Sequence, residues 1–436
     1  MSNASDRPEP AQLRREIGAL GVAALTINII MGSGLFVIPA AMGALGAWAP
    51  AAIGFCALVM GAVTLSFIEA SSRVPRAGGV YGIVRVALGP AAAGVVGGMI
   101  WLSGTLAGAG ILAAAIDQVV PFVPWMGSPV GRPMVLFATA LLFMVVPLRG
   151  ARQSALASEL TTAIKLVPLV LFIAVAALLP PAPAGPTPPL DLGVAAPLLI
   201  LGIYLCAGIE SGMVMNGEVR DPTRTLPAGL GGALTAYAVL AIAIQVAAGH
   251  LLGGSLPASK APLVEGAARV GTWLPPIMAA AAVVSMVGSA AGLASTNPRI
   301  IFALSRDGLL PGILGQLHPV RRTPAVAIVA HGLLVATLAS AGEFRPLTVA
   351  ASLASMAVYV LGCVAALVLR RRGVAEAGRV VAWRLTPAAA GVAVIANLAI
   401  IASAPIEQSL GLVAASLVFA GLATVRNRRS VEGPTA

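Results

Sequence analysis

The sequence predicts an all-α protein that crosses a membrane many times. Of its 436 residues, 58% are hydrophobic and only 10% are charged. The apolar residues gather in runs of about 20, which is the length a helix needs to cross the hydrocarbon core of a bilayer. A soluble protein carries about 25% charged residues, and a soluble chain this apolar would expose large apolar patches. Composition therefore argues against a soluble enzyme or binding module.

Twelve apolar runs follow one another along the chain, and each is predicted to form one membrane span. They lie near residues 17–44, 50–71, 90–120, 131–148, 153–180, 195–215, 227–253, 273–303, 324–341, 346–369, 383–403 and 406–425. Residues 181–194, which begin with PAPAGPTPPLD, are predicted to be a connecting loop, because proline cannot continue a helix.

The basic residues predict the orientation of these spans. With an even number of spans, both ends of the chain lie on one side, and we take that side as cytoplasmic. The segments outside the cell then hold only Arg132, Lys260, Arg269 and Arg345 of the 27 Lys and Arg, and Lys165 lies within a span. This distribution follows the positive-inside rule. It predicts cytoplasmic tails at 1–16 and 426–436, an external 181–194 loop, and a net charge of +11 that needs no nucleic-acid partner.

The first span contains a predicted break at Gly32-Ser33-Gly34. Glycine in a helix interior costs about 1 kcal/mol, so two glycines around a serine favour local unwinding. Backbone that leaves a helix inside a bilayer is tolerated where it lines a cavity or is buried in protein. The half-helix after the break points free N–H groups and a positive dipole end toward that place, which suits a carboxylate. The alternative is a packing seam of small residues.

A second predicted break lies in the sixth span, where Gly208 and Gly212 flank Glu210. A carboxylate deep in an apolar segment is costly and marks a functional pathway by default; a structural glutamate bonded across helices is the alternative. The two breaks lie about five spans apart, as in transporters with inverted repeats. We therefore predict five-helix repeats at 17–180 and 195–369, followed by the last two helices at 370–425.

Four stretches of the sequence resemble one family, the amino acid–polyamine–organocation superfamily of permeases. They are IIMGSGLFVIPA at 29–40, RVPRAGGVYGIVRVALGP at 73–90, GIESGMVMNGEVRDPTRTLPAGL at 208–230 and NPRIIFALSRDGLLPGILGQLHPVRRTPAVAI at 297–328. They occur in the family's order and at the matching span positions. The resemblance implies a leucine-transporter-like fold with helices 1 and 6 broken.

The same resemblance implies a substrate site between helices 1 and 6. Ser33 and Gly34 would bind a substrate carboxylate, and the carbonyls of Ile30, Tyr204 and Ala207 would bind its ammonium. The implied substrate-binding set is Ile30, Gly32, Ser33, Gly34, Tyr204, Ala207 and Gly208. Glu210 matches the sixth-helix glutamate of the family, which implies a coupling or gating role. Leu293 stands where arginine-exchanging members have tryptophan, which favours a neutral substrate.

Lys165 is the one basic residue placed deep in a predicted span, about 20 Å along the helix from Arg152. Taking an ammonium out of water favours its neutral form, so this amine could release and regain a proton during transport. The family includes members in which a fifth-helix lysine stands in for sodium. The alternative is a permanently charged lysine held by carbonyls of the broken first helix.

Together these features predict a secondary amino acid permease of the inner cell membrane. We expect alternating access, a neutral substrate, and proton coupling or independence of sodium. The partners expected are an amino acid, the lipid bilayer and protons; no cofactor, metal or catalytic residue is expected. The alternatives are an amino acid or amine antiporter or exporter on the same fold, and a sensor that binds an amino acid without transporting it.

Overall fold

Helices account for the regular structure of the protein. The computed structural model describes residues 18–74, 79–149, 152–185, 189, 191–210, 221–318, 323–376 and 380–431, and none of these lies in a strand. The α-helices are α1 (Ala19–Ile30), α2 (Gly34–Gly43), α3 (Ala49–Arg73), α4 (Gly79–Leu88), α5 (Pro90–Val119), α6 (Gly131–Arg149), α7 (Arg152–Leu178), α8 (Leu192–Cys206), α10 (Pro222–Leu252), α11 (Pro262–Ala267), α12 (Leu274–Arg306), α13 (Ala325–Ala341), α14 (Phe344–Arg371), α15 (Thr386–Ala402) and α16 (Ile406–Val431). Short 3-10 turns lie at Gly46–Trp48, Pro124–Gly127, Gly253–Ala258 and Gly312–Gly315.

The helices identify the chain as a multi-pass membrane protein. Six of them, α3, α5, α10, α12, α14 and α16, are long and apolar enough to cross a bilayer, and α1 with α2 passes the same test as one bent span. The remaining predicted runs coincide with α6, α7, α8, α13 and α15. Helix α4 is an addition, because sequence analysis treated residues 73–90 as a loop.

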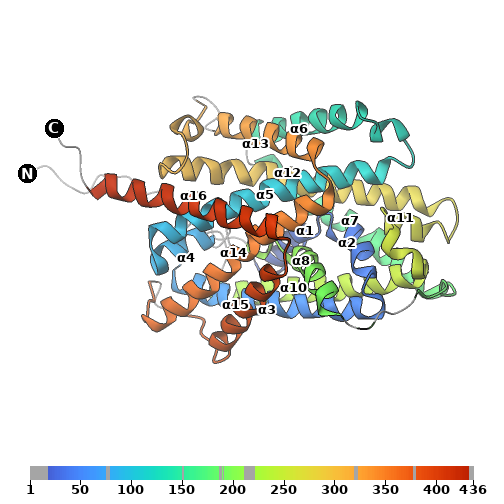
Figure 1. Ribbon diagram of the computed structural model, residues 1–436, viewed down its shortest axis with the longest axis horizontal. Coiled ribbons are helices and arrows are strands. Elements are labelled where there is room, and N and C mark those ends of the chain that lie inside the picture. Colours follow the sequence, from blue (N-terminus) through green and yellow to red (C-terminus); the bar gives the residue numbers. More distant parts are fainter. Residues whose placement is uncertain are drawn as a thin grey trace, which may run out of the picture.

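Helix α5 occupies the middle of the bundle and packs against α12, α14 and α16 (Figure 1). Helices α6 and α13 pair along the upper edge in this view, and α3, α10 and α15 lie on the opposite side. The short helices α1 and α2 lie inside, where α1 packs on α10 and α7 while α2 packs on α8 and α10. Residues 30–36 in the middle of the first span are all buried, so the protein encloses the place where this span is broken.

Glycines on one face of α5 allow α12 to approach closely. A Cβ at Gly97 would lie 2.8 Å from Leu304 Cδ2, and one at Gly104 would lie 2.4 Å from the side-chain amide of Asn297. The residue numbers in these two contacts rise along α5 and fall along α12, so the two helices are antiparallel. Small residues drive such contacts because apolar helices in lipid associate through close packing. This seam sets the position of α12, which supplies groups to the break described below.

Polar contacts join the C-terminal ends of several helices. Glu69 on α3 is buried and accepts hydrogen bonds from Arg73 at 2.7 Å and from Arg370 of α14 at 2.9 Å. Tyr81 on α4, outside the predicted spans, donates to Asp307 just after α12. Burial and this hydrogen bond raise the pKa of Tyr81 to about 12, so the phenol keeps its proton and remains a donor at neutral pH. Asp307 therefore ties the end of α12 to α4.

The seam predicts opposite effects of two glycine-to-alanine changes. Gly104→Ala places a methyl group against Asn297, and overpacking of this kind costs about 1–3 kcal/mol. Gly391→Ala on α15 meets no atom within 4 Å and gains about 1 kcal/mol of helix propensity. Thermal unfolding in detergent should show a lower Tm for Gly104→Ala and an equal or higher Tm for Gly391→Ala. Equal changes in both variants would contradict close packing at the seam.

Candidate functional site

The first span breaks at the predicted place. Helix α1 ends at Ile30, α2 begins at Gly34, and their axes meet at 55°. The carbonyl of Met31 accepts a hydrogen bond from Ser285 Oγ of α12 at 2.8 Å, and Ser289 Oγ lies 3.3 Å from the same oxygen. These hydroxyls satisfy a carbonyl that the helix itself cannot, so the break can exist within an apolar environment.

The carbonyl of Ile30, at the end of α1, also has partners within the protein. It accepts from the N–H of Gly32 at 2.7 Å and from Tyr237 Oη of α10 at 3.4 Å. Side chains from α10 and α12 therefore hold the break from two sides. Sequence analysis missed Tyr237, Ser285 and Ser289; the four-residue spacing of the two serines on one helix was the available signal.

Ser33 is the N-cap residue directly before α2 and is fully buried. Its side chain makes no capping bond to α2, and its Oγ lies 3.4 Å from Tyr204 Oη, a hydrogen bond that either group can donate. Among the described residues, none accepts a hydrogen bond from the N–H of Gly34. The start of α2 thus presents a hydroxyl and N–H groups at the positive end of a helix, which is chemistry that binds a carboxylate.

The second break lies beside the first. Helix α8 ends at Cys206, and Ala207 and Gly208 form a turn before residues 209–210 resume helical structure. Gly208 has a φ of +112°, and a Cβ there would lie 3.2 Å from Ile29 Cγ2 of α1. Glycine is required at this position both by the backbone conformation and by the approach of α1. Gly212, the other predicted glycine, lies outside the described residues.

Gly34 has a packing role in addition to the predicted ligand contact. A Cβ at this position would lie 2.9 Å from Leu205 Cδ1 of α8, so the missing side chain lets α2 and α8 come together. A Cβ at Gly32 would meet only ordinary contacts, with Ile111 Cδ1 at 3.6 Å as the nearest. Of the two glycines in the break, Gly34 is therefore the one that packing restricts.

An aromatic pair lies next to Ser33. The ring of Tyr204 meets Phe344 of α14 edge to face, with 6.3 Å between the ring centroids. Tyr204 also accepts a bond through its carbonyl from the N–H of Ala207 at 3.1 Å. Tyr204 therefore connects α8, the start of α2 and α14.

Glu210 has two partners that fix its carboxylate. Its Oε2 accepts from the N–H of Gly208 at 3.1 Å and from Tyr359 Oη of α14 at 3.0 Å. The first bond closes the turn at the α8 break, and the second attaches that turn to α14. In this conformation the carboxylate stabilises the second break through these two hydrogen bonds, one of which crosses to α14. This is the structural role given above as the alternative to a functional one.

Lys165 reaches the first span from α7. The side chain is fully buried, and its Nζ donates to Asn28 Oδ1 of α1 at 2.7 Å. The partner is thus a side-chain amide less than one turn before the break. The carbonyls of Ile30 and Met31 bind Tyr237 and serine hydroxyls. Sequence analysis missed Asn28, although a polar residue within the apolar run was visible.

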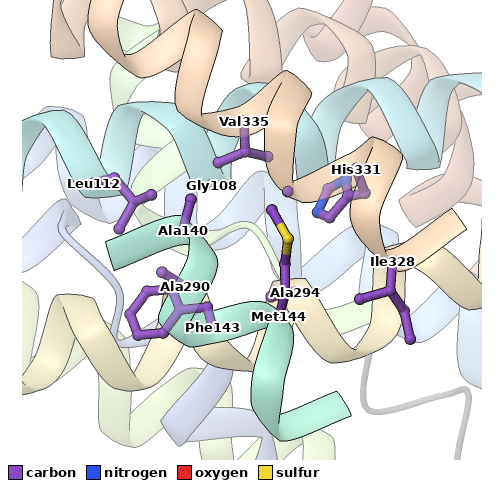
Figure 2. Close-up of a pocket in the computed structure, with 11 residues that line it drawn as sticks. Gly108, Leu112, Ala140, Phe143, Met144, Ala290, Ala294, Ile328, His331 and Val335 are labelled. Carbon is purple, nitrogen blue, oxygen red and sulfur yellow. The ribbon is translucent and has the colours of Figure 1, made fainter. Parts of the chain in front are cut away.

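A pocket lies beside the breaks, between α5, α6, α12 and α13 (Figure 2). It holds about 370 Å³ of empty space, including space open to the surroundings, and none of the predicted substrate residues lines it. Its walls are apolar except for His331, which is buried. The breaks are the stronger candidate site, because a serine hydroxyl and the N–H groups at the start of α2 meet there, whereas the one polar side chain in the pocket wall is His331.

A bundle of apolar helices that encloses two adjoining helix breaks has the features of a membrane transporter, in which such breaks form the central site. The model of the amino acid permease family matches residues 17–422, and the chain belongs to this family. The chain is similar to the branched-chain amino acid permease BcaP of Bacillus subtilis, with 26% identity over 83% of this chain and 82% of that protein.

Two further relatives cover the chain to a similar extent. An uncharacterized transporter of Mycobacterium tuberculosis is 30% identical over 83% of this chain and 82% of its own length. The methylthioribose transporter of Bacillus subtilis is 25% identical over 84% of each chain. Two of these relatives are named for different substrates, branched-chain amino acids and methylthioribose, and all three are transporters.

The second break predicts a specific sensitivity at Gly208. Gly208→Ala forces a side chain into the left-handed region, which costs about 1–2 kcal/mol, and presses it against Ile29. We expect a lower Tm in detergent and reduced ligand-induced stabilisation. Gly232→Ala on α10, where a Cβ meets nothing within 4 Å, is the matched control. A Gly208→Ala protein as stable as this control would show that the turn does not need glycine.

Proposed function

We propose that the protein is a secondary active transporter that moves amino acids across the cell membrane by alternating access. The observation that carries this proposal is the meeting of the two breaks: Ser33, just before α2, contacts Tyr204 of α8, and Gly208 of the second break lies against Ile29 and Ile30 at the end of α1. Membership of the amino acid permease family supports the same conclusion.

The proposal includes the number, orientation and repeat of the membrane-spanning helices. We propose twelve spans with both termini in the cytoplasm, arranged as two inverted five-helix repeats and two further helices. A helix within each predicted run supports the count, and the two breaks at corresponding positions support the repeat. Rocking of one group of helices against the other around the breaks would expose the site to each side in turn.

The proposed substrate pose follows from the groups around the breaks. The carboxylate binds Ser33 Oγ and the first N–H groups of α2, because the helix dipole favours an anion there. The ammonium binds carbonyl oxygens of Ile30, Tyr204 and Ala207. The Tyr204 carbonyl accepts one protein bond and has a second lone pair for the ammonium. The Ile30 carbonyl accepts two, so the ammonium would replace the longer bond of 3.4 Å from Tyr237. The ring of Tyr204 with Phe344 covers the site.

A substrate with an uncharged side chain fits the surroundings of the two breaks best. Glu210, the acidic residue near the breaks, is held by Gly208 and Tyr359 and is not presented as a free counter-ion for a cationic substrate. Leu293 supplies an apolar side chain on α12. The relative that transports branched-chain amino acids supports an aliphatic substrate, whereas the methylthioribose transporter makes a substrate without carboxylate the second candidate.

For coupling, we propose that Lys165 takes the place of a sodium ion and exchanges a proton during the cycle. The amine is buried and lies against α1 close to the break. A change in its charge at this position acts on the segment that forms half of the substrate site. Transport then depends on pH and is independent of sodium.

The substrate proposal is tested by uptake and counterflow in proteoliposomes with labelled branched-chain, small neutral and cationic amino acids and methylthioribose. We expect neutral amino acids to be transported, and N-acetylated or amidated analogues to compete poorly. Ser33→Ala removes a buried hydrogen bond worth about 1–3 kcal/mol, which should weaken apparent affinity about 5- to 150-fold. Thr235→Ala, an exposed hydroxyl on α10, is the control. Uptake of methylthioribose without uptake of any amino acid would contradict the amino acid proposal and favour the second candidate, a substrate without carboxylate.

The coupling proposal is tested by uptake against pH in wild type, Lys165→Ala and Lys165→Arg, each in sodium and in potassium. Wild type should respond to pH and ignore the choice of cation. Lys165→Ala should lose the pH response, and Lys165→Arg should not restore it, because guanidinium stays charged. A sodium-driven wild type, or an alanine variant with an unchanged pH profile, would leave Lys165 as a structural cation.

A further inference from the structure

Asn28 is a polar residue within the apolar helix α1. Its side chain is buried, and its Oδ1 accepts a short hydrogen bond of 2.7 Å from Lys165 Nζ. The two residues are far apart in the chain, on α1 and α7. Burying an ammonium is costly unless it is paired or hydrogen-bonded, so this contact bears directly on the charge of the lysine.

The other side chains that the structure describes around Lys165 do not supply a charge to balance it. Helix α7 packs against α1, α12, α10 and α6. Helix α1 carries no titratable residue, and α12 carries none before Arg299 near its C-terminal end. From α10, Tyr237 is bound to the carbonyl of Ile30, while Arg224 and His250 lie near its ends; α6 carries Arg132 and Arg149 at its ends. Within the described residues, no carboxylate lies within 4 Å of Lys165 Nζ.

A neutral partner has a consequence for proton exchange. A carboxylate beside the lysine would favour the charged form strongly, and an aliphatic residue would leave an ammonium without an acceptor. The amide oxygen of Asn28 can accept a hydrogen bond from the ammonium and also from the neutral amine, since both carry N–H donors. The contact between α7 and α1 can therefore persist while the proton leaves Nζ for water and returns.

We propose that Asn28 is the positioning residue for Lys165: its side-chain amide holds the amine against α1 in both charge states and sets the pH at which transport responds. This inference rests on the proposed coupling role of Lys165. Asn28 lies less than one turn before Met31, whose carbonyl is bound by α12. A change in the force between Lys165 and Asn28 thus acts on the segment of α1 that leads into the break.

The test measures uptake against pH in proteoliposomes containing wild type, Asn28→Asp or Asn28→Leu, each with Lys165 intact and with Lys165→Ala. Asn28→Asp places a carboxylate beside the amine and stabilises its charged form. The midpoint of the pH response should move up by about 1–3 pH units. Asn28→Leu removes the acceptor and should move the midpoint down. Both shifts should vanish with Lys165→Ala, whereas Asn397→Leu, at a buried asparagine on α15, should leave the midpoint unchanged.

A second measurement separates failure of this inference from failure of the proposed coupling. Tm in detergent is measured for Asn28→Leu, Lys165→Ala and the double variant. Non-additive changes in Tm, together with the midpoint shifts, support the proposal. If the Tm changes are additive, and the pH response depends on Lys165 but has the same midpoint in the Asn28 variants, the role of Asn28 is overturned and the coupling role of Lys165 stands. If the Tm changes are non-additive but Lys165→Ala keeps the pH response of wild type, the coupling role of Lys165 is overturned. The function of Asn28 as its positioning residue is then overturned as well.

Discussion

The arrangement of the site depends on the hydrogen bonds that satisfy the carbonyls of the broken first span. An unpaired backbone carbonyl at membrane depth costs several kcal/mol. Ser285 supplies a hydroxyl to Met31, and Tyr237 supplies one to Ile30. These bonds let α1 stop and α2 start at a new angle within the bundle. Without them, the N–H groups at the start of α2 would not face the second break.

Close approaches at glycine bring the supporting helices into position. Gly104 lets α5 and α12 meet, which places Ser285 at the break; Gly34 and Gly208 let α8 meet α2 and α1. In lipid there is no hydrophobic force between apolar helices, so contact at short range and polar bonds across the interface hold them together. The site is thus a product of the same packing that holds the bundle together.

The polar groups of the site are few, and most are engaged with one another. Glu210 is bound to Gly208 and Tyr359, and Lys165 is bound to Asn28. Ser33 is different, because its hydroxyl makes one long contact with Tyr204 and leaves α2 without a side-chain cap. The carboxylate position that we propose therefore lies at Ser33, while Glu210 and Lys165 are hydrogen-bonded to the segments of the second and the first break.

Sequence alone determined the apolar runs, the break at Gly32-Ser33-Gly34 and the unusual position of Lys165, because hydropathy, glycine content and a buried charge are local properties of the chain. Gly208 also predicted the second break from the sequence. Only the tertiary structure decided that Ser285 and Tyr237 satisfy the break, that Asn28 receives Lys165, and that Leu205 packs closely against Gly34. These contacts join helices that are distant in the chain, and a serine, an asparagine or a leucine in an apolar run carries no mark of its partner until the helices are packed.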